Sequence, residues 1–210
     1  INVPANWVVK KPSALTSIEA MSIGTAGLTA AASVLKIQES AQESDLPVLV
    51  SGAPGGVGSI GVMLMSKLDK EVTALTGKSS SADFLKSIGA KNVILRDDFL
   101  EGPVKPMERA LFSSAIDTVG GNVLSKMLTQ ISPHGVVACC GNVAGIEVNT
   151  TVFPFILRGI TLAGIDSAES SLEFKTSVWK KFANEWKLDH SPIIKVVTQD
   201  TLQPEIDLIL

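Results

Sequence analysis

The sequence predicts an α/β fold whose core is a doubly wound, six-stranded parallel sheet. Segments of strand length and segments of helical character alternate from residue 47 onward. The strand segments are nearly continuous apolar runs, such as Val48-Leu49-Val50 and Val136-Val137-Ala138-Cys139, which is typical of strands buried on both faces. With 210 residues, of which 45% are hydrophobic, the chain is long enough for a substantial core.

Residues 1–46 are predicted to form a helical lead-in. Thr16-Ser17-Ile18-Glu19 has the spacing of a capping box, which predicts a helix start at this point. A second helix with many small residues is expected from Gly24. Small side chains there would let another backbone or a ligand come close.

The remaining elements fall into two segments. Residues 47–167 are predicted to form a nucleotide-binding domain, with strand Val48–Ser51, helix Ser59–Leu68, strand Val72–Leu75, helix Ala82–Ile88, strand Asn92–Leu95, a helix near Met107–Leu111, strand Ser114–Thr118, helix Asn122–Gln130, strand Val136–Cys140 and strand Ile160–Asp166. Residues 168–210 should form a helix with an aromatic stripe (Trp179, Phe182, Trp186) and a truncated return segment, with strand Ile193–Thr198 and a helix ending at Leu210.

A glycine-rich turn joins the first strand of the predicted sheet to the helix that follows. Gly52, Gly55, Gly56 and Gly58 lie in this turn, Ala53 takes the place of the first glycine of the dinucleotide spacing, and Pro54 removes one N–H donor. Backbone N–H groups at a helix N-terminus attract phosphate, and a Cβ atom would hold a diphosphate away. The strand–turn–helix context favours a Rossmann-type dinucleotide site. The alternative is a close-packed turn that binds nothing.

The second strand indicates which dinucleotide would bind. Sites that prefer NAD usually end this strand with a carboxylate for the ribose 2′-hydroxyl, whereas here Thr76 is followed by Gly77, Lys78 and a run of serines. An ammonium group and hydroxyl donors suit a 2′-phosphate. We therefore predict NADP(H), with Lys78 as the charge partner. The alternative is a solvated lysine beside serines that only cap the next helix.

Composition excludes several other classes of function. A net charge of −3 without a basic cluster argues against nucleic acid as a partner. We also expect no membrane span and no signal peptide, and hence a cytoplasmic protein. The two cysteines, Cys139 and Cys140, are adjacent and lack the spacing of a zinc site, so no metal site is predicted.

Six segments together carry a family resemblance: Ile23–Ala30, Ser51–Gly58, Leu85–Ala90, Ala115–Gly120, Thr151–Gly159 and Gly164–Ser167. With them the chain resembles the zinc-independent medium-chain dehydrogenase/reductases, in the quinone oxidoreductase-like group, and within it the acryloyl-CoA reductase subfamily. The resemblance implies NADPH-dependent reduction of an activated C=C bond, in an enoyl-CoA such as acryloyl-CoA or in a quinone-like acceptor. Hydride would go to the β-carbon and a proton to the α-carbon.

The resemblance also implies roles for particular residues, although it assigns no catalytic residue. Thr29, Phe155 and Ile156 would face the nicotinamide, and Gly141 and Asn142 would line its ribose. The diphosphate loop would comprise Gly52, Ala53, Gly55, Gly56 and Val57, and the 2′-phosphate would meet Thr76, Lys78 and Ser80. Arg158 would meet either a phosphate or a carboxylate.

The family's N-terminal GroES-like substrate domain has no apparent counterpart in this sequence. We therefore expect the chain alone to bind coenzyme weakly and to turn over poorly. A homodimer through the edge strand Ile160–Ile165 is expected, as in relatives.

Two rival functions are compatible with parts of this sequence. A short-chain dehydrogenase would fit Gly52, Gly56 and Gly58, but it needs a catalytic tyrosine, and the chain contains none. The second rival is a nucleotide-binding or dimerisation module without catalysis.

Overall fold

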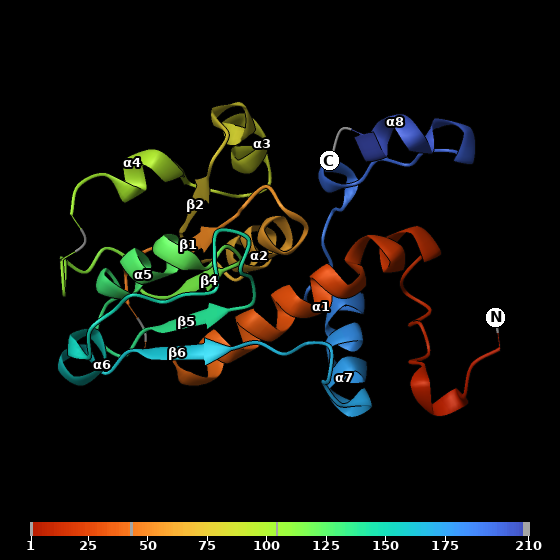
Figure 1. Ribbon diagram of the computed structural model, residues 1–210. Helices are drawn as coiled ribbons and strands as arrows, with labels where there is room; N and C mark the ends of the chain where they lie inside the picture. Colours follow the sequence, from red (N-terminus) through yellow and green to blue (C-terminus); the bar gives the residue numbers. More distant parts are fainter. Residues whose placement is uncertain (1, 43, 104, 208–210) are drawn as a thin grey trace.

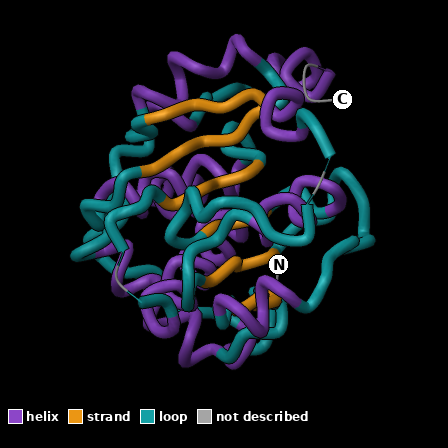
Figure 2. Tube along the Cα trace, turned by 90° about the vertical axis from the view of Figure 1, so that its left-hand side faces the viewer, coloured by secondary structure: helices purple, strands orange, loops and turns teal. Residues whose placement is uncertain are grey.

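Six parallel strands form one sheet in the order β3-β2-β1-β4-β5-β6. The strands are β1 (Val48–Ser51), β2 (Val72–Thr76), β3 (Asn92–Leu95), β4 (Ala115–Asp117), β5 (Val136–Cys139) and β6 (Thr161–Gly164). The computed structural model describes residues 2–42, 44–103 and 105–207. Figure 2 shows the strands stacked one beside the next. This order confirms the predicted doubly wound Rossmann sheet.

Helices cover both faces of the sheet (Figure 1). The helices of the chain are α1 (Ser17–Ser40), α2 (Gly56–Lys67), α3 (Ala82–Ser87), α4 (Arg96–Leu100), α5 (Gly121–Thr129), α6 (Phe153–Arg158), α7 (Leu172–Ala183) and α8 (Leu202–Asp207). Helix α8 lies away from the sheet in Figure 1 and buries none of its described residues. Two apolar clusters follow from the alternation of side chains along each strand. Val48 and Val50 pack with α1, α2 and α7 on one face, whereas Leu49 packs with α5 on the other.

Helix α1 begins at the predicted capping box and is interrupted at Gly24. Thr16 Oγ1 accepts the N–H of Glu19 at 3.1 Å, and Glu19 Oε2 accepts the N–H of Thr16 at 2.7 Å. Gly24 has φ +45° and ψ −150°, so the two helices predicted from the sequence, the second of them from Gly24, join at a kink. By length and composition α1 could cross a membrane, but it packs against α2 and β5 as a core helix does.

The predicted helix near Met107–Leu111 is wrong. Two prolines, Pro103 and Pro106, precede this segment, and its backbone runs across the end of α5 instead of coiling. The N–H of Glu108 donates to the carbonyl of Thr129 at 3.1 Å, and the N–H of Leu111 donates to that of Gln130 at 2.8 Å. The helix in this part of the chain is α4, directly after β3.

The predicted strand Ile193–Thr198 is also wrong. Ser191–Ile193 form a 3₁₀ turn, and the extended residues beyond it do not join the sheet, whose last strand is β6. A strand needs a neighbour for its backbone groups, and Val196 lies 74% exposed. The aromatic stripe does pack together, with Phe182 6.5 Å from Trp179 and 6.1 Å from Trp186 between ring centres. Leu210, the predicted end of the last helix, lies outside the described residues.

Candidate functional site

A cleft of about 790 Å³ opens at the carboxyl ends of the central strands. Strand β1 lies between β2 and β4. The strands that follow β1 are added on one side of it as far as β3, and the later strands are added on its other side from β4 onward. Ligands bind at such a switch point of the strand order. The walls come from the loops that follow β1, β2, β3, β4 and β5: Gly52, Pro54, Gly55, Leu75, Thr76, Gly77, Lys78, Arg96, Thr118, Val119, Val123, Val143 and Ala144.

The glycine turn after β1 has the features of an anion site. Gly52 adopts φ +57°, which favours glycine, and α2 starts at Gly56, three residues earlier than predicted. The residue before the helix is Gly55, which has no side chain to cap the first N–H groups. The N-terminus of α2 therefore offers backbone donors and the positive end of the helix dipole to an anion.

Close packing explains why glycine is required in this turn. A Cβ atom at Gly58 would lie 2.3 Å from the carbonyl oxygen of Gly52, and one at Gly52 would lie 2.2 Å from Thr118 Oγ1. Gly55 and Gly56 remain exposed, so their backbone can be approached from outside. Ala53, in contrast, is fully buried and its N–H donates to the carbonyl of Leu75 at 3.2 Å. Ala53 therefore supports the loop from below.

Two cations, Lys78 and Arg96, lie at one end of the cleft, where the loops that follow β2 and β3 form its wall. Lys78 was expected there, and its N–H donates to Thr76 Oγ1 at 3.1 Å. Sequence reasoning missed Arg96, whose guanidinium lies beside Gly77 and pairs with Asp97 at 3.4 Å on the surface. Its position directly after β3 was the signal, because carboxyl ends of parallel strands share an edge. Ser80 lies exposed in the 3₁₀ turn Ser79–Ser81 that follows Lys78.

The opposite side of the same edge carries Thr29, Gly141 and Asn142. Thr29 Oγ1 lies 2.6 Å from the hydroxyl of Ser167, beyond the carboxyl end of β6, and donates to the carbonyl of Thr25 at 2.9 Å. Gly141 packs so tightly on the turn after β4 that a Cβ atom would lie 2.0 Å from the carbonyl of Thr118. These residues therefore lie at the same edge as the glycine turn.

The structure does not bring Phe155, Ile156 and Arg158 to the cleft. They lie in α6, which directly precedes β6 and therefore sits at the amino edge of the sheet, at the left of Figure 1. The Arg158 guanidinium donates to the carbonyls of Thr129 and Ile131, each at 2.9 Å, and to that of Glu108. Burial lowers the pKa of Arg158. None of the three residues lines the cleft.

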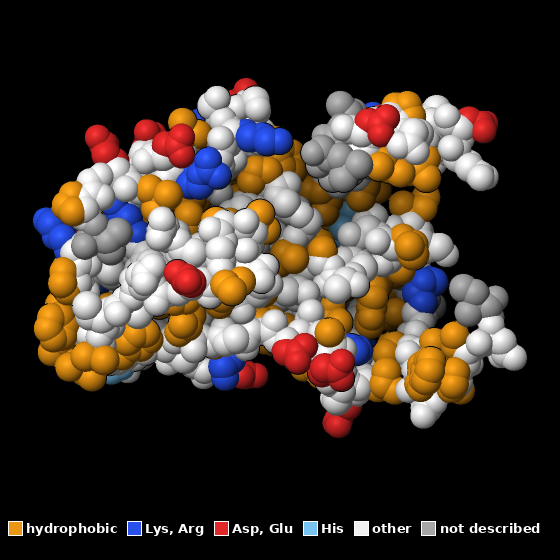
Figure 3. Space-filling view, viewed as in Figure 1, with side chains coloured by type: hydrophobic (Ala, Val, Ile, Leu, Met, Phe, Trp, Pro, Cys, Tyr) orange, Lys and Arg blue, Asp and Glu red, His pale blue; other side chains and the backbone are white. Residues whose placement is uncertain are grey.

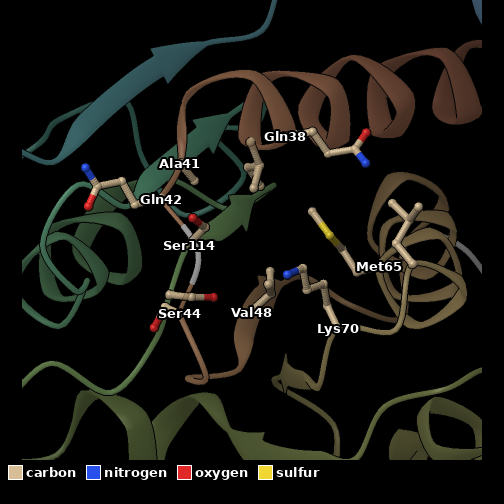
Figure 4. A pocket seen from close by; sticks show the side chains of 11 residues that line it. Gln38, Ala41, Gln42, Ser44, Val48, Met65, Lys70 and Ser114 are labelled. Carbon is tan, nitrogen blue, oxygen red and sulfur yellow. The ribbon is translucent and has the colours of Figure 1, made fainter.

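A second hollow, of about 260 Å³, lies at the amino ends of β1 and β4 (Figure 4). Gln38, Gln42 and Lys70 reach its walls from the ends of α1 and α2. Because it opens at the edge opposite the glycine turn, it is separate from the cleft, and its Lys70 is a cation that the cleft does not contain.

Metal-ligating residues do not gather in the part of the chain that the structure describes: no group of three His, Cys, Asp or Glu side chains is placed to hold an ion. Burial raises the pKa of Cys139 and raises that of Cys140 to about 11, with Asp117 adding to both shifts. Both thiols therefore stay protonated near neutral pH, whereas a metal ligand or nucleophile would be a thiolate.

Comparisons with known proteins agree with this architecture. The family described as zinc-binding dehydrogenase matches residues 56–184. Acrylyl-CoA reductase AcuI of Ruegeria pomeroyi is 37% identical over 189 residues, which are 90% of this chain and 57% of that protein.

Two solved structures superpose closely. One is the yhdH oxidoreductase of Salmonella enterica in complex with NADP, with a TM-score of 0.91 and 37% identity over 98% of this chain and 63% of that one. The other is yhfP of Bacillus subtilis with NAD bound, with a TM-score of 0.91 and 38% identity over 99% of this chain and 65% of that one. This chain thus spans less than two thirds of each relative.

Proposed function

We propose, from the premise that this chain belongs to the zinc-binding dehydrogenase family, that it is the coenzyme-binding part of an NADP(H)-dependent reductase. The reaction is the reduction of an activated C=C bond in a small-molecule acceptor, an enoyl-CoA such as acryloyl-CoA or a quinone-like compound. The similarity to acrylyl-CoA reductase AcuI supports this acceptor class. We place the protein in the cytoplasm.

The observation that carries the coenzyme assignment is the charge pattern of the cleft. Its described lining contains two cations, Lys78 and Arg96, and no carboxylate. The uncapped N-terminus of α2 suits the diphosphate, and the two cations suit a 2′-phosphate on the adenosine ribose. Arg96 is only weakly engaged by Asp97, since the two side chains are 49% and 87% exposed.

Within this proposal the coenzyme supplies the hydride, and the chain binds and orients it. Gly56 and Val57 hold the diphosphate through backbone N–H groups. Gly52, the buried Ala53 and Gly55 shape the loop, since the N–H of Gly55 donates to the carbonyl of Gly52 at 2.9 Å and its missing side chain leaves room for the diphosphate. Thr76 and Lys78, with Ser80 at the rim, hold the 2′-phosphate together with Arg96.

The nicotinamide half then lies over the carboxyl ends of β4, β5 and β6, because each half of such a sheet binds one mononucleotide. Thr29, paired with Ser167, and the turn Gly141-Asn142 border that region. Catalysis here rests on positioning the reactants and excluding water.

We further propose that the reaction needs no zinc ion held by the described residues, because both cysteines are protonated and face Asp117 rather than a shared cavity.

A homodimer is proposed through β6. This edge strand pairs only with β5 in the described chain, and Leu162 is 36% exposed on it. Figure 3 shows hydrophobic side chains gathered over α6, next to the start of β6. Light scattering of wild type and Leu162→Lys tests this: a monomeric wild type contradicts it.

Coenzyme titration tests the assignment directly. Lys78→Ala and Arg96→Ala should each weaken NADPH binding by about 1–2 kcal/mol, roughly tenfold, after allowance for solvent screening, and leave NADH binding unchanged. The matched control is Lys70→Ala, in the hollow at the opposite edge, which should change neither. Equal binding of NADPH and NADH by wild type and both variants would contradict the assignment.

Turnover separates the enzyme from a module without catalysis. NADPH oxidation is followed with acryloyl-CoA, with a quinone and with neither, for this chain and for any longer product of the same reading frame. We expect acceptor-dependent oxidation by the longer product and little by this chain alone. Coenzyme binding without acceptor-dependent oxidation in either would favour the nucleotide-binding module.

A further inference from the structure

Asp117, at the carboxyl end of β4, is a fully buried carboxylate that the proposed reaction does not use. Its Oδ1 atom accepts the hydroxyl of Ser51 at 2.6 Å and the N–H of Val119 at 3.2 Å. Its Oδ2 atom accepts the N–H of Gly120 at 3.0 Å and faces the thiol of Cys139 at 3.7 Å. Among the described residues no ion pair includes it. Burying a carboxylate in this way is costly, so its hydrogen bonds must achieve something an apolar side chain would not.

These hydrogen bonds lead directly to the two loops that form the cleft. Ser51 is the last residue of β1 and immediately precedes Gly52. Its hydroxyl also accepts the N–H of Thr118 at 3.0 Å, and its carbonyl accepts the Thr118 hydroxyl at 2.8 Å. The ladder between β1 and β4 pairs Leu49 with Ala115 and Val50 with Ile116, so the side chains of Ser51 and Asp117 continue it by one step.

We propose that Asp117 is a positioning residue for diphosphate binding. Through Ser51 it fixes the start of the glycine turn, and through the N–H groups of Val119 and Gly120 it fixes the turn after β4. The spacing between these two walls sets where a diphosphate can meet the N-terminus of α2. This inference rests on the proposed coenzyme function.

The chemistry of the four partners explains why a carboxylate is needed. All four are donors, and an ionised carboxylate is the side chain that only accepts. Asparagine has the same shape, but its NH₂ group would face a donor on one side. The Ser51 hydroxyl can rotate to accept, whereas the N–H of Val119 or Gly120 cannot. Asp117→Asn therefore loses at least one bond in either orientation.

The charge of Asp117 alone predicts the opposite effect of Asp117→Asn on NADPH binding. The direction in which the NADPH affinity changes therefore distinguishes repulsion from positioning. A negative carboxylate beneath an anion-binding loop repels a diphosphate, so removing its charge should tighten NADPH binding. Positioning predicts weaker NADPH binding by Asp117→Asn. Adenosine 2′-monophosphate provides the matched probe, because it carries the 2′-phosphate but no diphosphate.

Calorimetric titration of the whole chain gives both Kd and the number of sites for each probe. For Asp117→Asn we expect Kd for NADPH to rise by about tenfold or more. Kd for adenosine 2′-monophosphate should stay within about twofold, and the number of sites should not change. Ser51→Ala should shift Kd for NADPH in the same direction, and the double variant should show less than the sum, because both changes disturb the same hydrogen-bonded network between β1 and β4. If Asp117→Asn fails to fold, Ser51→Ala carries the same test.

Ser113→Ala is the control, since its hydroxyl contacts the carbonyl of Pro47 at the amino end of β4, away from the cleft. It should leave both Kd values unchanged. Unchanged or tighter NADPH binding by Asp117→Asn and Ser51→Ala would overturn the inference, as would an equal loss of both probes. Wild type that binds neither probe would overturn the proposed function and this inference with it.

Discussion

Gly58→Ala is the sharpest test of the packing of the glycine turn. The added methyl group would lie 2.3 Å from the carbonyl oxygen of Gly52, 2.7 Å from the Cα atom of Ala53 and 2.9 Å from the carbonyl carbon of Gly52. All three are backbone atoms, which cannot move aside by a change of rotamer. To restore a 3.0 Å contact with the carbonyl oxygen, the turn must shift by the difference of 0.7 Å.

The energetic cost can be estimated from this displacement. Overpacking of this kind costs about 1–3 kcal/mol. The carbonyl that must move also accepts the N–H of Gly55 at 2.9 Å, and losing that bond costs about 1 kcal/mol. Alanine recovers about 1 kcal/mol of helix propensity within α2. We therefore expect a net loss of about 2 kcal/mol, or about 4–8 °C in Tm for a domain of this size.

Calorimetry or a dye-monitored thermal melt measures the change in Tm. Titration with NADPH should show Kd raised at least tenfold, which corresponds to a loss of about 1.4 kcal/mol or more in binding free energy. Gly61→Ala, one turn further along α2, is the control: its methyl group would meet two side-chain atoms and no backbone atom, Ile116 Cδ1 at 3.2 Å and Val50 Cγ1 at 3.8 Å. Its Tm and NADPH affinity should stay close to wild type. A Gly58→Ala protein indistinguishable from wild type in both measurements would refute the packing described here.

Three further predictions concern the rest of the fold. Burial lowers the pKa of His190 from its ordinary 6.5 despite the nearby charges of Glu19 and Asp189, and neither ring nitrogen has a partner among the described residues. The unfolded chain therefore takes up the proton first, so Tm should fall as pH drops below about 6.5, and His190→Phe should flatten that decline. Arg158→Lys should lower Tm, because one ammonium group cannot reach three carbonyls, yet leave NADPH affinity unchanged; a large loss of affinity would contradict its place at the amino edge. Phe182→Ala should cost about 3–5 kcal/mol in denaturant unfolding, and a loss below about 1 kcal/mol would contradict the packing of α7.

Much of the fold could be predicted because the relevant signals are local. The alternation of apolar strands and helices gave the sheet, and the capping box at Thr16 placed the start of α1. The two wrong elements depended on tertiary context instead. The 107–111 segment forms backbone bonds to the end of α5, and Ile193–Thr198 has an extended sequence pattern but no strand beside it.

The candidate site was predictable in its loops and less so in its side chains. The glycines and Lys78 directly follow strands, and the carboxyl ends of parallel strands meet at one edge of the sheet, so these residues could be expected to lie together. The same rule would have found Arg96 after β3 and would have placed α6, which precedes β6, at the other edge. The hydrogen bonds of Asp117 could not be inferred, because they depend on the register between β1 and β4, which sequence spacing does not contain.

The break at Gly24 determines how far α1 can extend as a straight rod. The segment after it, residues 25–40, is about 24 Å long at 1.5 Å per residue. The hydrocarbon layer of a bilayer is about 30 Å thick. Although its composition resembles that of a spanning helix, α1 falls short of that thickness by about one helical turn once the kink is counted. Its small residues instead allow close approach to α2, where a Cβ atom at Gly56 would lie 3.3 Å from the methyl group of Ala26.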